Sequence, residues 1–209
     1  MPKQEDIGGL MQKIILASAS SRRRELLASL GLEFKVIPSR GEEVFDSNKT
    51  LEENIQSIAL SKAKSVAAKV DEDCIVIGAD TIVAVDGRIL GKPKDMAEAG
   101  EMLRCLSDRA HFVYTGFALI RKSDNKVQAG YEKTLVDFRP LSKEMIDAYI
   151  QTGEPLDKAG AYGIQGIGAV FVKGIKGDYS NVVGLPLCRI ATELEKFGIN
   201  ILGNTHRLI

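Results

Sequence analysis

The stretch "CIVIGADTIVAVDGRILG", residues 74–91, indicates the fold class most directly. Residues 74–80 are apolar up to a closing aspartate, and residues 81–91 fold back at Asp86-Gly87, a dipeptide typical of hairpin turns. We therefore expect two strands, the first of them buried. Asp80 would end that buried strand, where the sheets of α/β proteins open into a ligand crevice. The alternative is that Asp80 serves only as a turn or cap residue.

Strands and helices alternate on both sides of this stretch. Thr50 with Glu53, and Asp95 with Glu98, have the spacing of residues that interact at a helix N-terminus. The other elements follow from the periodicity of apolar residues. We expect strands over 13–18, 34–39, 112–122, 127–138 and 169–174, and helices over 22–31, 50–70, 96–106, 142–152 and 185–197.

The alternation predicts a mixed α/β fold, a central sheet flanked by helices. No linker interrupts it, so we expect a single domain over residues 13–209. Residues 1–12 are polar and contain glycine, which indicates a flexible tail. They lack a signal-peptide core, and no apolar stretch is long enough to cross a membrane. We therefore expect a cytoplasmic protein without a membrane partner.

The charge balance argues against extended contact with nucleic acid. Lys plus Arg (28) equals Asp plus Glu (28), whereas proteins that bind duplexes through their overall field are basic. Five Tyr, seven Phe and no Trp leave few side chains to stack on bases. No stable nucleic-acid partner is expected, and any anion site must be local.

The cysteines and histidines do not suggest a zinc site. Cys74, Cys105 and Cys188 are far apart and form no C-x-x-C pair, and the only histidines are His111 and His206. This pattern argues against a zinc cluster and a disulfide framework. Cys74 lies in an apolar run, so we expect a buried thiol rather than a reactive one.

The stretch "ASASSRRRE", residues 17–25, places three arginines where a helix begins. Cations are unfavourable at that end of the helix dipole. Backbone N–H groups, the hydroxyls of Ser18 and Ser20 and the guanidinium groups of Arg22 and Arg23 would together suit a phosphate. The alternative is a solvated basic turn paired with nearby acids. Without an anion we expect the arginines to repel each other, so that Arg23→Ala barely lowers the stability of the empty protein.

Acidic residues favour the phosphate interpretation. Glu42 and Glu43 follow the second expected strand, and Asp80 closes the third. Carboxylates beside a phosphate site usually require a divalent cation, and oxygen ligands suit Mg²⁺ or Mn²⁺.

Two lysines and one loop are further candidates for binding a ligand, although their sequence signals are less specific. Lys62 and Lys92 have the residue type of phosphate ligands, although an isolated lysine is usually a surface residue. In "DKAGAYGIQG", residues 157–166, the glycines allow close backbone approach to a ligand, and Gln165 offers a donor and an acceptor. A set of tight turns is the alternative for this loop.

Five motifs in order resemble the Maf family, the septum-formation-inhibitor-like nucleotide pyrophosphatases. They are "LASASSRRRELL", "GEE", "GADTIV", "GKPKD" and "DKAGAYGIQG", and the likeness runs from about Lys13 to about Leu202. One departure is Ser21, where the family usually has proline before its arginine pair. A serine can still cap the helix.

The resemblance implies a Maf/ITPase-like α/β fold with a nucleotide-binding cleft. It implies hydrolysis of dTTP and UTP to the monophosphate and pyrophosphate, and it leaves modified pyrimidine nucleotides as further candidate substrates. A divalent metal, Mg²⁺ or Mn²⁺, is the implied cofactor. Family members often pair, which suggests a homodimer.

The resemblance also implies roles for individual residues. Asp80 is the proton acceptor for the attacking water, and Glu43 with Asp80 holds the metal. Ser18, Ser20, Arg23, Lys62 and Lys92 bind the substrate, the last three through its phosphates. The positions associated with base preference, which also contact the substrate, are Arg22, Thr81 and Gln165.

Two other functions remain open from the sequence alone. One is a non-catalytic regulator of cell division that binds nucleotide or nucleic acid, as the family's older name suggests. The other is a nucleotide-binding switch that hydrolyses nothing. The joint presence of Asp80, Glu43, Lys62 and Lys92 favours catalysis, because attack on a shielded phosphorus needs charge neutralisation.

Overall fold

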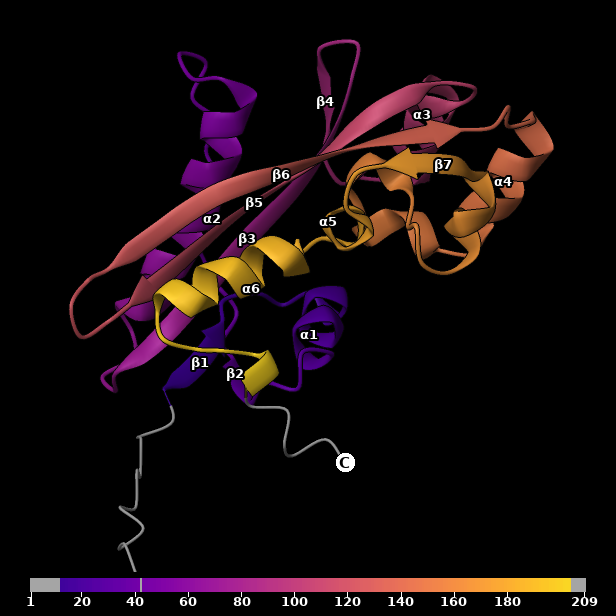
Figure 1. Cartoon of the computed structure of the whole chain (residues 1–209). Helices are drawn as coiled ribbons and strands as arrows, with labels where there is room; N and C mark the ends of the chain where they lie inside the picture. Colours follow the sequence, from indigo (N-terminus) through magenta and orange to yellow (C-terminus); the bar gives the residue numbers. More distant parts are fainter. Residues whose placement is uncertain (1–11, 42, 204–209) are drawn as a thin grey trace, which may run out of the picture.

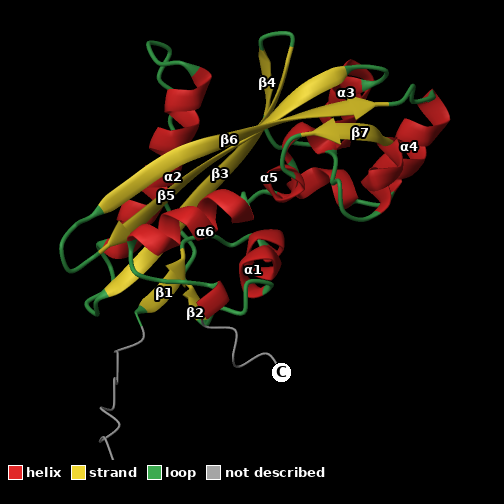
Figure 2. Cartoon of the chain, viewed as in Figure 1, coloured by secondary structure: helices red, strands yellow, loops and turns green. Residues whose placement is uncertain are grey.

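A mixed sheet of seven strands runs through the computed structural model, which describes residues 12–41 and 43–203 (Figures 1 and 2). The strands are β1 (Lys13–Leu16), β2 (Phe34–Val36), β3 (Cys74–Val85), β4 (Arg88–Leu90), β5 (Ala110–Arg121), β6 (Val127–Phe138) and β7 (Val172–Lys176). Their order is β2-β1-β3-β5-β6-β7, with β4 paired to β3. β1 is parallel to both neighbours, and the other pairings are antiparallel. The expected mixed α/β fold is confirmed.

Helices cover both faces of this sheet. They are α1 (Ser21–Ala28), α2 (Leu51–Ala67), α3 (Met96–Leu106), α4 (Lys143–Gln151), α5 (Tyr179–Val183) and α6 (Leu187–Lys196), with short 3₁₀ turns η1 (Glu154–Asp157), η2 (Ala159–Ala161) and η3 (Ile167–Phe171). Side chains alternate between the two faces of a strand. Val76 and Ile82 of β3 pack toward α2. Ile77 and Val83 lie on the opposite face, which carries α1, α6, α3 and α4.

The opposite face holds two separate apolar clusters. Ile75, Ile77 and Ala79 of β3 pack with α1 and α6, whereas Val83 and Val85 pack with α3 and α4. Figure 1 shows these two helix groups at different ends of the long strands β3 and β5. On this face Thr81 of β3 therefore lies between the two clusters.

Residues 78–82 of β3 lie at a break in strand pairing. β1 pairs with β3 from Cys74 to Ile77, and β4 pairs with it from Val83 to Val85. On this edge, none of the strands described pairs with residues 78–82. On the other edge β5 pairs with β3 without interruption from Ile75 to Ala84. The segment thus has a continuous strand partner on one edge and none of the described strands on the other.

Two glycines bring α2 very close to the sheet. A Cβ atom on Gly78 would lie 2.4 Å from the Ala59 carbonyl oxygen, and one on Gly116 would lie 2.2 Å from that of Ile55. Real Cβ atoms do not approach backbone this closely, so only glycine fits at both positions. The contact sets the depth at which Lys62 of α2 approaches β3.

The structure corrects two predictions about the first half of the chain. Residues 74–80 and 81–91 do not form separate strands, because β5 pairs across the junction (Asp80 with Gly116, Thr81 with Thr115) and β3 continues to Val85. Asp80 therefore lies inside a strand. The hairpin turn at Asp86-Gly87 is confirmed.

The expectation that Ser21 caps the helix is wrong. The cap of α1 is Ser20, which accepts from the Arg23 backbone N–H, and Ser21 is the first helical residue. Proline is favourable at this first helical position. A serine in its place does not change the cap, because the capping side chain belongs to Ser20. The capping box of Thr50 and Glu53 and the Asp95 cap are confirmed.

The glycine-rich region holds more structure than the sequence predicted. It contains α5 and three 3₁₀ turns, and β7 begins only at Val172 because η3 occupies the preceding residues. The expected tail over 1–12 lies outside the described residues except for Gln12, and the assignment of 13–209 to one domain stays a prediction. Among the helices described, none combines the length and apolar character that crossing a bilayer requires.

Candidate active site

A pocket opens at the accessible edge of β3, between the two apolar clusters. α1 and α2 supply part of its wall, and β3 supplies the floor. The segment after β4, the end of η1 with the residues that follow it, and the end of α5 complete the wall. The structure brings together here almost every predicted site residue: Ser20, Arg22, Arg23, Lys62, Asp80, Thr81, Lys92 and Gln165. The other two, Ser18 and Glu43, bond to Arg23 and Lys62 respectively. Glu42 lies outside the described residues.

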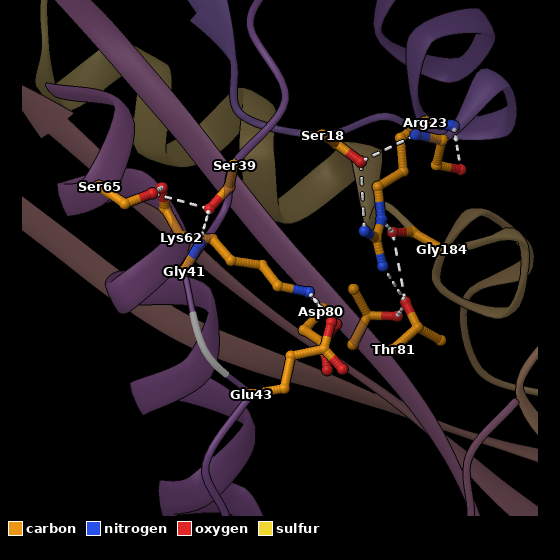
Figure 3. A network of polar contacts seen from close by, with 12 residues as sticks. Ser18, Arg23, Ser39, Gly41, Glu43, Lys62, Ser65, Asp80, Thr81 and Gly184 are labelled. Carbon is orange, nitrogen blue, oxygen red and sulfur yellow. Dashed lines mark hydrogen bonds and ion pairs between the residues drawn. The ribbon is translucent and has the colours of Figure 1, made fainter. Parts of the chain in front are cut away.

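Lys62 joins two carboxylates at one end of the pocket (Figure 3). Its Nζ lies 2.6 Å from Asp80 Oδ1 and 2.6 Å from Glu43 Oε1. The side chains of Lys62 and Asp80 are each 12% exposed, and that of Glu43 is 59% exposed. The hydrogen bond from Lys62 lowers the pKa of Glu43 despite partial burial, and the charge of Lys92 acts in the same direction. The partly buried Lys62 ammonium thus brings the Asp80 and Glu43 carboxylates together.

Arg23 is built into the opposite wall. Its Nε donates to the Gly184 carbonyl oxygen at 2.8 Å, Nη2 to Thr81 Oγ1 at 2.9 Å and Nη1 to Ser18 Oγ at 3.4 Å. Burial lowers the pKa of its guanidinium, and the negative charge of Asp80 partly offsets this. Figure 3 shows the guanidinium between the α1 turn and Thr81.

Arg22 faces a different partner. Its Nη1 lies 2.7 Å from Asp157 Oδ2, and Nη2 donates to the Asp157 carbonyl oxygen at 3.3 Å. Lys158 also contacts Asp157, at 2.7 Å. The ion pair links α1 to η1 across the pocket. The expected repulsion is present, because, besides burial, the charge of Arg22 lowers the pKa of Arg23. Each arginine nevertheless has oxygen acceptors on a neighbouring segment, so neither is unpaired.

Glu154 holds the loop that carries Gln165. Its carboxylate accepts from the Tyr149 hydroxyl at 2.9 Å, the Ile167 N–H at 3.0 Å and the Gly168 N–H at 3.1 Å. Burial acts to raise the pKa of Glu154, but these hydrogen bonds outweigh it and the pKa is lowered. Sequence reasoning missed both Glu154 and Asp157. Their position at the start of the glycine-rich loop was the available signal.

His111 lies behind the pocket wall. Its Nε2 is 2.8 Å from the hydroxyl of Tyr162, a pocket residue, and burial lowers the pKa of the imidazole to about 4. It is neutral near pH 7. His206 lies outside the described residues. Cys74 is buried as predicted, and its thiol pKa is raised by that burial.

A family model described as "Maf-like protein" matches residues 13–197. The chain belongs to the Maf family. It is 50% identical over 193 residues to a protein of Moorella thermoacetica named "dTTP/UTP pyrophosphatase", covering 92% of this chain and 99% of that one. A protein of the same name from Bacillus cereus is 52% identical over 191 residues, covering 91% and 98%. The resemblance stated from the five motifs is confirmed.

Solved structures with some likeness to this Maf-family chain are more distant. A HAM1 protein from Coxiella burnetii gives a TM-score of 0.40 at 22% identity, covering 61% of this chain and 73% of that one. A nucleoside-triphosphatase (dITP/XTP pyrophosphatase) from Mycobacterium abscessus gives 0.39 at 16% identity, covering 94% and 99%.

The contacts of Arg23 change what its removal should do. Arg23→Ala leaves Thr81 Oγ1 and the Gly184 carbonyl without their donor, so we expect the melting temperature of the empty protein to fall, by about 2–4 °C for each kcal/mol lost. Nucleotide affinity should also weaken by about 1–3 kcal/mol. Melting curves with and without a non-hydrolysable triphosphate measure both effects. Arg24→Ala, an exposed neighbour on α1, is the control. An unchanged melting temperature would show that these hydrogen bonds add nothing to stability.

Proposed function

We propose that this protein hydrolyses dTTP and UTP, and modified pyrimidine nucleotides, between the α and β phosphates. The products are the nucleoside monophosphate and pyrophosphate. The observation that carries the proposal is the pairing of buried Asp80 with Lys62 in a pocket also lined by Arg23 and Lys92. The near-complete alignment with proteins named dTTP/UTP pyrophosphatase supports the choice of substrate.

The cations suit the phosphate groups. Arg23 and Lys62 reach the pocket from α1 and α2, on either side of Asp80, and Lys92 lies exposed at its rim. A triphosphate shields its α-phosphorus with negative oxygens, so nucleophilic attack requires this charge to be neutralised. Asp80 is placed to accept the proton of a water that attacks the phosphorus.

Glu43 and Asp80 fit a divalent metal. Both carboxylates already converge on one cation, the Lys62 ammonium, and oxygen ligands suit Mg²⁺ or Mn²⁺. The described residues contain no group of three or more His, Cys, Asp and Glu that could hold a metal ion. Substrate oxygens and water would complete the coordination, as is common for Mg²⁺. The bound ion would lower the pKa of water and neutralise phosphate charge.

Arg22, Thr81 and Gln165 are the proposed determinants of base preference. Uracil and thymine present an acceptor, a donor and an acceptor along their pairing edge, and a glutamine amide can match two of these groups. The hydrogen bonds of Glu154 hold the backbone just beyond Gln165. We also propose a cytoplasmic enzyme without a nucleic-acid partner, consistent with the balanced charge, and a homodimer by analogy with the family.

A pyrophosphate-release assay tests the proposal. With Mg²⁺ or Mn²⁺ we expect hydrolysis of dTTP and UTP, weaker hydrolysis of CTP and purine triphosphates, and no activity in excess chelator. Adding back either ion without zinc should restore the activity. Full activity in chelator would contradict the metal role of Glu43 and Asp80. Binding of nucleotide without any release of pyrophosphate would favour the regulator or switch function.

A further inference from the structure

Three hydroxyl and guanidinium groups form a continuous chain beneath the pocket. Arg23 Nη2 lies 2.9 Å from Thr81 Oγ1, which lies 2.9 Å from Thr115 Oγ1, which lies 3.0 Å from the Asn181 backbone carbonyl oxygen. Thr81 of β3 and Thr115 of β5 are direct partners in the strand register. Thr115 and Asn181 are fully buried, whereas Thr81 is partly exposed and lines the pocket.

The two ends of this chain fix the direction of every hydrogen bond in it. A carbonyl can only accept, so Thr115 must donate its proton to Asn181. Thr115 Oγ1 then accepts the proton of Thr81, and Thr81 in turn accepts from Arg23, which has no acceptor atom. The other acceptor near Thr81, the Gly184 carbonyl oxygen, is 3.5 Å away and already accepts from Arg23 Nε at 2.8 Å. The hydroxyl proton of Thr81 is therefore donated to Thr115 and is not available to a ligand.

A hydroxyl group that already donates its proton to another residue can act toward a ligand only as a hydrogen-bond acceptor. Such a group cannot bind a phosphate, since phosphate oxygens are themselves acceptors. It matches an N–H or O–H donor of the nucleoside. Uracil and thymine carry a hydrogen on N3, whereas N3 of cytosine is an acceptor. A lone pair at Thr81 would attract the first two rings and repel the third.

We infer that Thr115 is a positioning residue for substrate selection, because it fixes the Thr81 hydroxyl as an acceptor for N3–H of uracil and thymine. The inference rests on the proposed function and deepens it. It attributes the weaker hydrolysis expected for CTP to a buried residue that does not line the pocket. Sugar hydroxyls could also meet the Thr81 lone pair, but cytidine nucleotides share them, so they would give no selection.

Thr115→Val tests the inference, because it keeps the shape of the side chain and removes the hydroxyl. The Thr81 proton is then free to turn toward the pocket and donate to N3 of cytosine. We expect the ratio of kcat/KM for CTP to that for UTP to rise about tenfold, the effect of one hydrogen bond worth about 1.4 kcal/mol. Thr115→Ser retains the hydroxyl and should keep the wild-type ratio.

The full-length chain and both variants should be melted alongside the kinetics. If Thr115→Val lowers kcat/KM for UTP and CTP by the same factor, the residue serves only the fold or Thr81 faces the sugar, and the inference is wrong. If Thr115→Val fails to fold, Thr81→Val is the substitution that tests the inference. It should lose about tenfold in kcat/KM for UTP without any loss for CTP, whose repulsion by the lone pair is removed, and an equal loss for both would overturn the inference.

Failure of the proposed function would be visible separately. A wild-type protein that releases no pyrophosphate from UTP or dTTP refutes that function. The selection can then be measured as the affinity of wild type and Thr115→Val for non-hydrolysable UTP and CTP analogues, from the shift of the melting temperature. An unchanged affinity ratio would overturn the inference in that case.

Discussion

Asp80→Asn is expected to reduce the hydrolysis of dTTP and UTP by about 10²–10⁴-fold, the usual contribution of a positioned general base. Asparagine has the same shape and can still accept the Lys62 hydrogen bond, now 2.6 Å long, but its amide cannot take a proton from water. Nucleotide should still raise the melting temperature of the variant. Steady-state release of pyrophosphate and a thermal shift with substrate analogue measure the two properties.

The matched control is Asp147→Asn. Asp147 forms an exposed ion pair with Lys143 one turn earlier on α4, so the same chemical change is made outside the pocket. Its turnover should equal that of wild type. If Asp80→Asn also turns over at nearly the wild-type rate, Asp80 is not the base. Glu43, the other carboxylate on Lys62, then becomes the candidate to replace next.

Gly116→Ala is expected to cost at least about 3 kcal/mol of stability, the upper part of the usual range for overpacking. The new Cβ would lie 2.2 Å from the Ile55 carbonyl oxygen and 3.0 Å from the Gln56 backbone nitrogen. Both atoms belong to the backbone of α2, so no flexible side chain can move aside. For a chain of this length the melting temperature should fall by roughly 6–12 °C.

The same substitution should affect catalysis in the molecules that remain folded. A displaced α2 moves Lys62 relative to Asp80, so kcat should fall at temperatures well below the melting transition. Gly174→Ala is the control, because nothing lies within 4 Å of the Cβ it adds to β7. Equal melting temperatures for the two variants would mean that α2 does not pack on Gly116 as described.

Local signals in the sequence predicted much of this architecture. The caps at Thr50 and Asp95 and the hairpin at Asp86-Gly87 are encoded within a few residues, and all are confirmed. The continuation of β3 through Asp80 was not predictable in this way. It depends on pairing with β5, in which Gly116 and Thr115 are the partners of Asp80 and Thr81, far away in the chain.

The candidate site shows the same division. The motifs supplied the residues that line the pocket, because residue type and family pattern suffice to find them. The partners that hold those residues were missed. Asp157 lies 135 positions from Arg22, and the Asn181 carbonyl lies 66 from Thr115. A position at the start of a glycine-rich loop can single out Asp157 as a candidate, but its pairing with Arg22 arises only from the folded topology, and no periodicity or spacing in the sequence indicates it.

The interruption in strand pairing along β3 has a consequence for solubility. Backbone groups at an open sheet edge can recruit a strand from another molecule, and long, flat, apolar edges are sites of aggregation. Here the open segment, residues 78–82, is only five residues long, and β1 and β4 stand at its two ends. A foreign strand would have to fit between them and over the Asp80 carboxylate and its ion pair with Lys62. The geometry that forms the pocket thus protects this segment of β3 from pairing with a strand of another molecule.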